Sequence, residues 1–228
     1  MGWLEARVLD VDDPSSLSGR ARARRWAELE RRFRGIEDMR VIDLGGTPRS
    51  WQVAPVRPLE VVCVNTNPDE AVSVDDRAVR SVVGDACDLP AGLRRERFDL
   101  VYSNSVLEHV GGHWRRAAFA EAVRTLSERH WVQTPYRYFP LEPHFLFPAL
   151  QHLPVHARAG VVRRWPFGHY GAVDRRDDAV ACVLAVELLS VADMAHYFPD
   201  SELERERVAG LTKSLIAVKG GLSPGAGA

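Results

Sequence analysis

The sequence has few lysines, few cysteines and no long apolar run. Only Lys213 and Lys219 are lysines, so 28 of the 30 basic residues are arginines, a bias that we attribute to genome composition. The formal net charge of −1 gives the chain as a whole no electrostatic reason to bind nucleic acid or an anionic membrane. No stretch approaches the roughly 18 consecutive apolar residues of a membrane span.

The three cysteines, Cys63, Cys87 and Cys182, are odd in number and far apart. This spacing argues against a disulfide framework and predicts reduced thiols. The N-terminus lacks a basic region followed by an apolar one, so we expect no signal peptide. A chain of 228 residues that is 46% hydrophobic and 27% charged is typical of a globular protein. We therefore expect a soluble cytoplasmic protein with one domain.

Five short apolar runs occur in the first 135 residues. They are RVID to Asp43, LEVVCVN to Asn65, SVVGD to Asp85, FDLVYSN to Asn104 and HWVQTP to Pro135. The first four run ends are 22, 20 and 19 residues apart, which allows a crossover between parallel strands. Buried runs that alternate with helical connections predict a doubly wound α/β sheet.

The remaining segments have other patterns. Amphipathic spacing predicts helices over 16–34 and 112–128, and another helix over 176–189. The segment 135–175 is rich in proline, aromatic residues and histidine, which predicts a cap with one or two helices. Residues 202–219 read as two strands joined at an Ala-Gly pair.

Polar side chains stand at the ends of the predicted parallel strands. These residues are Asp43, Asn65, Asp85, Asn104, Gln133 and Thr134. Ligands of doubly wound sheets bind outside the carboxyl ends of the strands, near the point where the strand order reverses. Such a series of polar strand ends therefore predicts a binding site at this edge.

The motifs at these ends resemble those of the class I S-adenosylmethionine-dependent methyltransferases, particularly small bacterial enzymes of methyltransferase type 11. The matching stretches are VIDLGG, VVCVNTNP, VVGDACDLP, FDLVYSNSVLEHV and TKSLIAVK. The resemblance covers about residues 36–134. It implies a Rossmann-like α/β fold with a seven-stranded, mostly parallel sheet, an antiparallel last strand and a cap inserted after strand five.

The resemblance also implies a division of the single domain and a set of S-adenosylmethionine-binding residues. The division is a helical lead-in at 1–35, a cofactor-binding half at 36–134, a cap and acceptor-binding segment at 135–190, a C-terminal helix and strand pair at 191–219, and a flexible tail at 220–228. The binding residues are Asp43, Gly45, Gly46, Thr47, Asn65, Thr66, Asp85, Ala86, Asn104 and Ser105. Glycines let the backbone approach the cofactor closely, and Asp43 and Asp85 supply acceptors.

Two features depart from the family pattern. Thr47, Pro48 and Arg49 replace later glycines, which predicts a stiffer turn and a short following helix. Asn65 stands where a ribose-binding acid is expected. One alternative is that Asn65 binds the ribose more weakly, because its amide oxygen is an uncharged acceptor. The other is that Asn67 or a main-chain group binds the ribose instead. An NAD-binding site fits less well, because G-x-G-x-x-G and the acid about 20 residues later are absent.

Candidate catalytic residues come from the fourth strand end and the cap. His109 is the first candidate for a general base, and Glu142 and His144 are the others; the alternative is that His109 braces the turn and that Glu142 and His144 shape the cap. His152 and His156 have i, i+4 spacing, which places them on one cap helix face, but no Cys or Glu completes a ligand set, so we predict no metal.

The favoured function is methyl transfer to a small-molecule acceptor, with O-methylation in bacterial secondary metabolism preferred over N- or C-methylation. We expect no nucleic-acid or membrane partner and allow a homodimer. The alternatives are a cofactor-binding protein with another reaction, such as a cyclisation, or none, and a scaffold that has lost the cofactor. Methylation of RNA or protein is less favoured, because the fourth strand lacks the Asn/Asp-Pro-Pro-aromatic signature.

Overall fold

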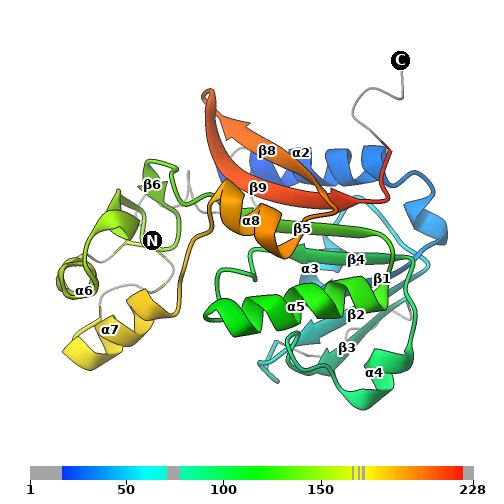
Figure 1. The fold of residues 1–228 in the computed structure, drawn as a ribbon, viewed down its shortest axis with the longest axis horizontal. Helices are drawn as coiled ribbons and strands as arrows, with labels where there is room; N and C mark the ends of the chain where they lie inside the picture. Colours follow the sequence, from blue (N-terminus) through cyan, green and yellow to red (C-terminus); the bar gives the residue numbers. More distant parts are fainter. Residues whose placement is uncertain (1–16, 71–77, 166, 169, 171–172, 223–228) are drawn as a thin grey trace.

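The computed structural model describes residues 17–70, 78–165, 167–168, 170 and 173–222. Its centre is a seven-stranded sheet with the order β3-β2-β1-β4-β5-β9-β8 (Figure 1). The strands are β1 (Arg40–Leu44), β2 (Glu60–Asn65), β3 (Val79–Val83), β4 (Leu100–Asn104), β5 (His130–Pro135), β8 (Glu202–Val208) and β9 (Leu211–Lys219). The first five run parallel, and β9 is antiparallel to β5 and β8. The predicted fold class is confirmed.

The central strands are buried along most of their length because both faces of the sheet are covered. Helix α2 (Leu17–Arg32) and the short α3 (Pro48–Gln52) cover one face, where Trp26 and Trp51 pack with Tyr102 of β4. Helices α4 (Ala91–Arg95), α5 (His113–Leu126) and α8 (Val191–Tyr197) cover the other face. Strand β8 lies at the edge and carries the charged run ELERER, which discourages pairing with further strands.

Helix boundaries follow from local chemistry. Helix α3 begins with Pro48 and spans five residues, as the stiff Thr-Pro-Arg turn predicts; the fixed φ of proline suits a first helical position. A 3-10 turn, η1 (Ile36–Asp38), precedes β1. Helix α8 begins after a capping box, in which the Ser190 Oγ accepts from the Asp193 N–H and the Asp193 carboxylate accepts from the Ser190 N–H.

The carboxyl end of β5 leads directly into the predicted cap, on the left in Figure 1. The cap comprises β6 (Leu141–Glu142), β7 (Phe147–Pro148), the 3-10 turn η2 (Leu150–His152), α6 (Val155–Val162) and α7 (Arg176–Leu184). Phe145, Leu150, Val162 and Val183 belong to a separate small core. The two cap helices pack on this core and thereby hold the β6–β7 hairpin beside the sheet.

Three sequence predictions need correction. Helix α7 ends at Leu184 rather than 189, because the next residues run alongside the sheet: the Glu187 N–H donates to the Glu108 carbonyl, and Leu189 bridges to Tyr136. Strand β3 ends at Val83 rather than at Asp85, whose side chain turns the chain by accepting from the Cys87 N–H. His152 and His156 lie on η2 and α6 respectively and not on one helix face.

Some predicted features lie wholly or partly outside the described residues. These are the lead-in before residue 17, the end of the tail after residue 222 and part of the aromatic stretch 165–171. Among the described helices, none combines the length and the apolar composition that crossing a membrane requires.

Candidate functional site

The turn after β1 is built around two glycines and a buried carboxylate. Gly45 has a φ of 87°, a conformation that favours glycine, and its N–H donates to the Val64 carbonyl. A Cβ on Gly46 would lie 1.7 Å from Oδ2 of Asp43. Gly46 is therefore required because the Asp43 carboxylate fills the space beneath it, which is a specific reason for this second glycine.

Asp43 is almost fully buried and has one unused oxygen. Its Oδ2 accepts a 2.7 Å hydrogen bond from the Trp51 indole N–H. Its Oδ1 has no hydrogen-bond partner among the described residues. Burial raises the pKa of Asp43 to about 7, although the Trp51 hydrogen bond opposes the shift. A cationic donor at Oδ1 would satisfy this acceptor and favour the ionised form.

Asp43 borders a cavity of about 180 Å³ beside the glycine turn. The cavity lining includes Arg22 and Arg25 of α2 and Asn104 of β4. Arg25 donates to the Asn104 side-chain oxygen and pairs with Glu206 of β8 at 3.3 Å. Arg22 and Arg25 belong to the RARARR run of α2, and both lie half-buried at the cavity.

A second cavity, of about 290 Å³, lies on the other side of Gly45, which lines both. The predicted residues at its wall are Asn65, Thr66, Asp85, Ala86, Ser105 and His109, together with Gly45. Val64, Val106 and Val110 supply apolar surface. All ten cofactor-binding residues predicted from sequence thus line these two adjoining cavities.

Asp85 is already engaged in an ion pair. Arg115 of α5 donates to its two oxygens at 3.0 and 2.8 Å, and the Cys87 N–H donates to Oδ1 at 2.8 Å. Burial opposes ionisation of Asp85, but these hydrogen bonds outweigh it and lower the pKa of Asp85. Arg115 was not predicted, because nothing in the sequence links it to a residue 30 positions earlier.

Asn65 braces the glycine turn. Its Nδ2 lies 3.3 Å from the Gly45 carbonyl and 3.1 Å from a carboxylate oxygen of Glu70, and its Oδ1 accepts from the Asn67 N–H at 2.9 Å. Glu70 therefore places a carboxylate at the end of β2, where the strand's last residue, Asn65, has only an amide side chain. Glu70 was not predicted as a site residue, and binding of ribose by Asn65 stays a prediction.

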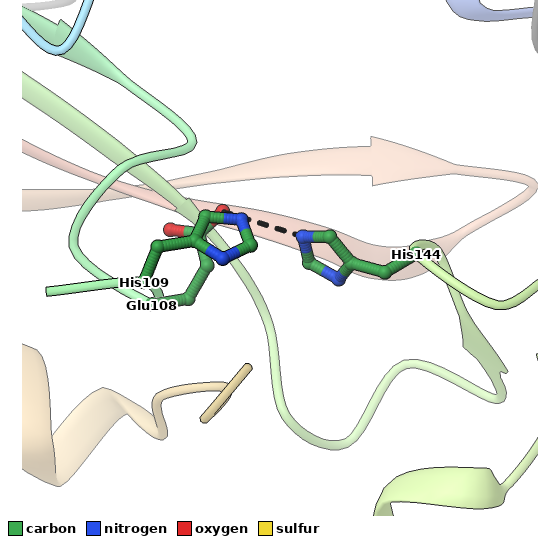
Figure 2. Close-up of side chains that lie close together, drawn as sticks. All are labelled: Glu108, His109 and His144. Atoms are coloured by element: carbon green, nitrogen blue, oxygen red, sulfur yellow. Dashed lines mark ion pairs between the residues drawn. The ribbon is translucent and has the colours of Figure 1, made fainter. Parts of the chain in front are cut away.

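Two chain segments bring two histidines and two glutamates together beside the second cavity. Glu108 is buried; its Oε2 accepts from the Thr134 hydroxyl at 2.9 Å, and its Oε1 has no hydrogen-bond partner in the described chain. Nε2 of His144 and Nε2 of His109 lie 3.8 and 4.0 Å from this Oε1. In Figure 2 the His109 ring overlaps the Glu108 carboxylate, and the His144 ring lies to the right of both.

Each imidazole of this cluster is oriented through its other nitrogen. His144 Nδ1 lies 2.8 Å from Oε1 of the buried Glu142, whose Oε2 accepts from the Phe145 N–H. His109 Nδ1 lies 3.2 Å from the Ala185 carbonyl. The rings of His109 and His144 meet edge to face with centroids 4.8 Å apart. The structure therefore unites all three predicted catalytic candidates.

Burial and charge oppose each other in this cluster. Burial raises the pKa of Glu108 to about 7, with His144 acting against the shift. Burial also disfavours the charged form of His144, but the Glu142 and Glu108 carboxylates outweigh it and raise the pKa of His144. Glu108 was not predicted as a site residue, although its place beside His109 in LEHV was an available signal.

The cap holds a third cavity, of about 350 Å³. Its wall includes Arg137, Glu142, Phe145 and Arg158, so Glu142 lies between this cavity and the histidine cluster. Tyr136 packs against the sheet core, whereas Tyr138 is exposed and stacks on His152.

Comparison with known proteins agrees with this architecture. Residues 44–132 match a family model described as a methyltransferase domain. A putative S-adenosylmethionine-dependent methyltransferase from Listeria monocytogenes superimposes with a TM-score of 0.55 at 11% identity, covering 88% of this chain and 99% of that one. No curated protein sequence is similar enough to count as a match.

Two further solved structures were crystallised with S-adenosylhomocysteine. Magnesium protoporphyrin IX methyltransferase from Synechocystis has a TM-score of 0.54 at 12% identity, over 96% of this chain and 88% of that one. The N-terminal domain of EvdMO1 has a TM-score of 0.53 at 17% identity, over 87% and 80%. Residues 44–132 thus match a methyltransferase domain, and the chain shares its fold with solved S-adenosylmethionine-dependent methyltransferases.

Proposed function

We propose that the protein transfers a methyl group to a hydroxyl oxygen of a small-molecule acceptor. The observation that carries this proposal is the position of His109, which lines the 290 Å³ cavity and also contacts the Glu108–His144 cluster. Methyl transfer requires a nucleophile held in line with the sulfonium carbon. A hydroxyl nucleophile must also lose its proton, which a cluster of imidazoles and carboxylates next to the cofactor can assist.

The two cavities around the glycine turn fit the parts of S-adenosylmethionine, which supplies the electrophilic methyl group when bound. Asp43 Oδ1 needs a donor and would accept from the α-ammonium group, while Arg22 and Arg25 would face the α-carboxylate. The 290 Å³ cavity, with Asn65 and Asp85 on its wall, would hold the adenosine. Gly45 lines both cavities and therefore lies beneath the junction of these parts.

This placement predicts a pH-dependent cofactor affinity. Asp43 is protonated in a large fraction of molecules below its raised pKa of about 7, and an ammonium partner would stabilise its ionised form, so binding releases a proton. The dissociation constant for S-adenosylhomocysteine should therefore decrease about tenfold from pH 5.5 to pH 7. Calorimetry at several pH values measures this change. In Asp43→Asn the dependence should vanish; a persistent dependence would place the titrating group elsewhere.

The acceptor would enter through the cap. The 350 Å³ cap cavity has the size of a small-molecule site, and Glu142 on its wall is hydrogen-bonded to His144. We further assign the enzyme to the cytoplasm and to bacterial secondary metabolism. The free thiols of all three cysteines and the arginine bias support this assignment.

A methyl-transfer assay tests the preference for oxygen. The protein is incubated with methyl-labelled S-adenosylmethionine and matched panels of phenols, alcohols, amines and activated carbon acids, and mass spectrometry locates the label. We expect product with hydroxyl acceptors. Transfer only to amines or carbon acids would contradict O-methylation, and tight cofactor binding without any transfer would favour a non-methylating role.

A further inference from the structure

We propose that Glu108, His109 and His144 form a binding site for one divalent transition-metal ion of the Zn²⁺ or Co²⁺ type. One ligand atom from each side chain lies within 4.8 Å of the others. The inference that this ion activates the acceptor rests on the proposed function, whereas metal binding itself does not.

The three donor groups converge on one point. Nε2 of His144 and Nε2 of His109 lie 3.8 and 4.0 Å from Oε1 of Glu108. Ligand atoms around a tetrahedral ion with bonds of about 2.0–2.1 Å are about 3.3 Å apart, so side-chain shifts of less than about 1 Å complete the geometry. At 3.8–4.0 Å these contacts are too long for hydrogen bonds. An ion would supply the partner that the buried Glu108 Oε1 lacks among the described residues.

The surrounding residues orient both imidazoles as metal ligands are oriented. A ligating histidine usually gives its other ring N–H to a carboxylate or a backbone carbonyl. His144 Nδ1 has Glu142 Oε1 at 2.8 Å, and His109 Nδ1 has the Ala185 carbonyl at 3.2 Å. Both contacts direct the two Nε2 atoms toward Glu108. Thr134 fixes the remaining oxygen of Glu108 from β5.

The types of ligand and the route of access limit which metal ion can bind. Two imidazoles and one carboxylate suit Zn²⁺, Co²⁺, Fe²⁺ or Ni²⁺ better than Mg²⁺ or Ca²⁺, which prefer all-oxygen sites. Three protein ligands leave a coordination position for a further oxygen. His109 is partly exposed and lines the proposed cofactor cavity, so an ion can reach the site from that side.

In the proposed reaction the ion polarises the acceptor hydroxyl. The hydroxyl proton passes to water, and an oxygen lone pair forms the new C–O bond. The C–S bond of the sulfonium breaks, its electron pair remains on sulfur, and a neutral thioether is released. The step consumes no oxidant or reductant, and the ion keeps its charge.

Metal titration without cofactor or acceptor tests the site. Tag-free protein is treated with EDTA, exchanged into chelator-free buffer and titrated with Co²⁺ by visible absorption and with Zn²⁺ by calorimetry. We expect one equivalent to bind. Glu108→Gln, His109→Gln and His144→Gln should each weaken binding at least 100-fold, and Glu142→Gln about 10- to 100-fold.

The double variant His152→Gln/His156→Gln is the matched control, because both histidines are exposed on the cap and outside the cluster. It should bind the metal like the wild type. The absence of stoichiometric binding to the wild type would overturn the proposal, as would wild-type affinity in the cluster variants or loss of affinity in the control. Circular dichroism tests whether each variant is folded. Because His109 is exposed, its substitution should disturb the structure least. Since no methyl donor is present, failure here is distinct from failure of methyl transfer.

Discussion

Replacing Gly46 with alanine should abolish measurable cofactor binding and lower the melting temperature. The new Cβ would lie 1.7 Å from Oδ2 of Asp43, so the carboxylate must move and lose its hydrogen bond from Trp51. Overpacking and a broken buried hydrogen bond together cost about 2–5 kcal/mol. For a domain of this size that corresponds to roughly 5–15 °C. The displaced carboxylate would also no longer face the cofactor ammonium, which should weaken binding at least 100-fold.

Gly92→Ala is the matched control for this prediction. Gly92 lies in α4, and a Cβ there meets nothing within 4 Å. Its substitution should leave cofactor affinity unchanged and slightly stabilise the helix. Thermal unfolding and calorimetry with S-adenosylhomocysteine report both effects. A Gly46→Ala protein with wild-type stability and affinity would show that the Asp43 carboxylate does not occupy the space beneath the turn.

Replacing His144 with glutamine should lower turnover by at least 100-fold while cofactor affinity changes little. His144 contacts Glu142 and Glu108, and His109 lies between this cluster and the cofactor cavity. Loss of the imidazole removes either proton transfer or ion binding at the acceptor, and general acid–base groups contribute about 10²–10⁴-fold. Turnover is measured with the best hydroxyl acceptor found in the panel.

His152→Gln serves as the control for the second prediction. His152 is exposed and stacks on Tyr138, so its loss changes the cap surface without reaching the cluster. Turnover of this variant should match the wild type. If His144→Gln retained full turnover, His144 would only shape the cap, which is the alternative that the sequence left open.

The strands and the glycine turn could be predicted from sequence because local patterns determine them. The apolar runs ending at Asp43, Asn65 and Asn104 become strands that end at or next to these residues, since buried parallel strands require continuous apolar sequence. The Thr-Pro-Arg turn likewise predicted the short α3. These features depend on neighbouring residues, not on distant ones.

The site's internal contacts could not be predicted because they join distant segments. Glu108 and His144 are 36 positions apart and meet only because the β6–β7 hairpin of the cap brings His144 to the segment that follows β4. The early end of α7 has the same origin, since residues after Leu184 form backbone hydrogen bonds along the sheet. Arg25 of α2 likewise reaches Asn104 across 79 residues.

Calorimetric titration of the wild-type protein with S-adenosylhomocysteine is the most direct test of the central claim that the cavities around Gly45 hold the cofactor. We predict one binding site with a dissociation constant well below about 1 mM, which corresponds to a binding free energy more favourable than about −4 kcal/mol. Absence of binding at that concentration for both S-adenosylhomocysteine and S-adenosylmethionine would contradict it.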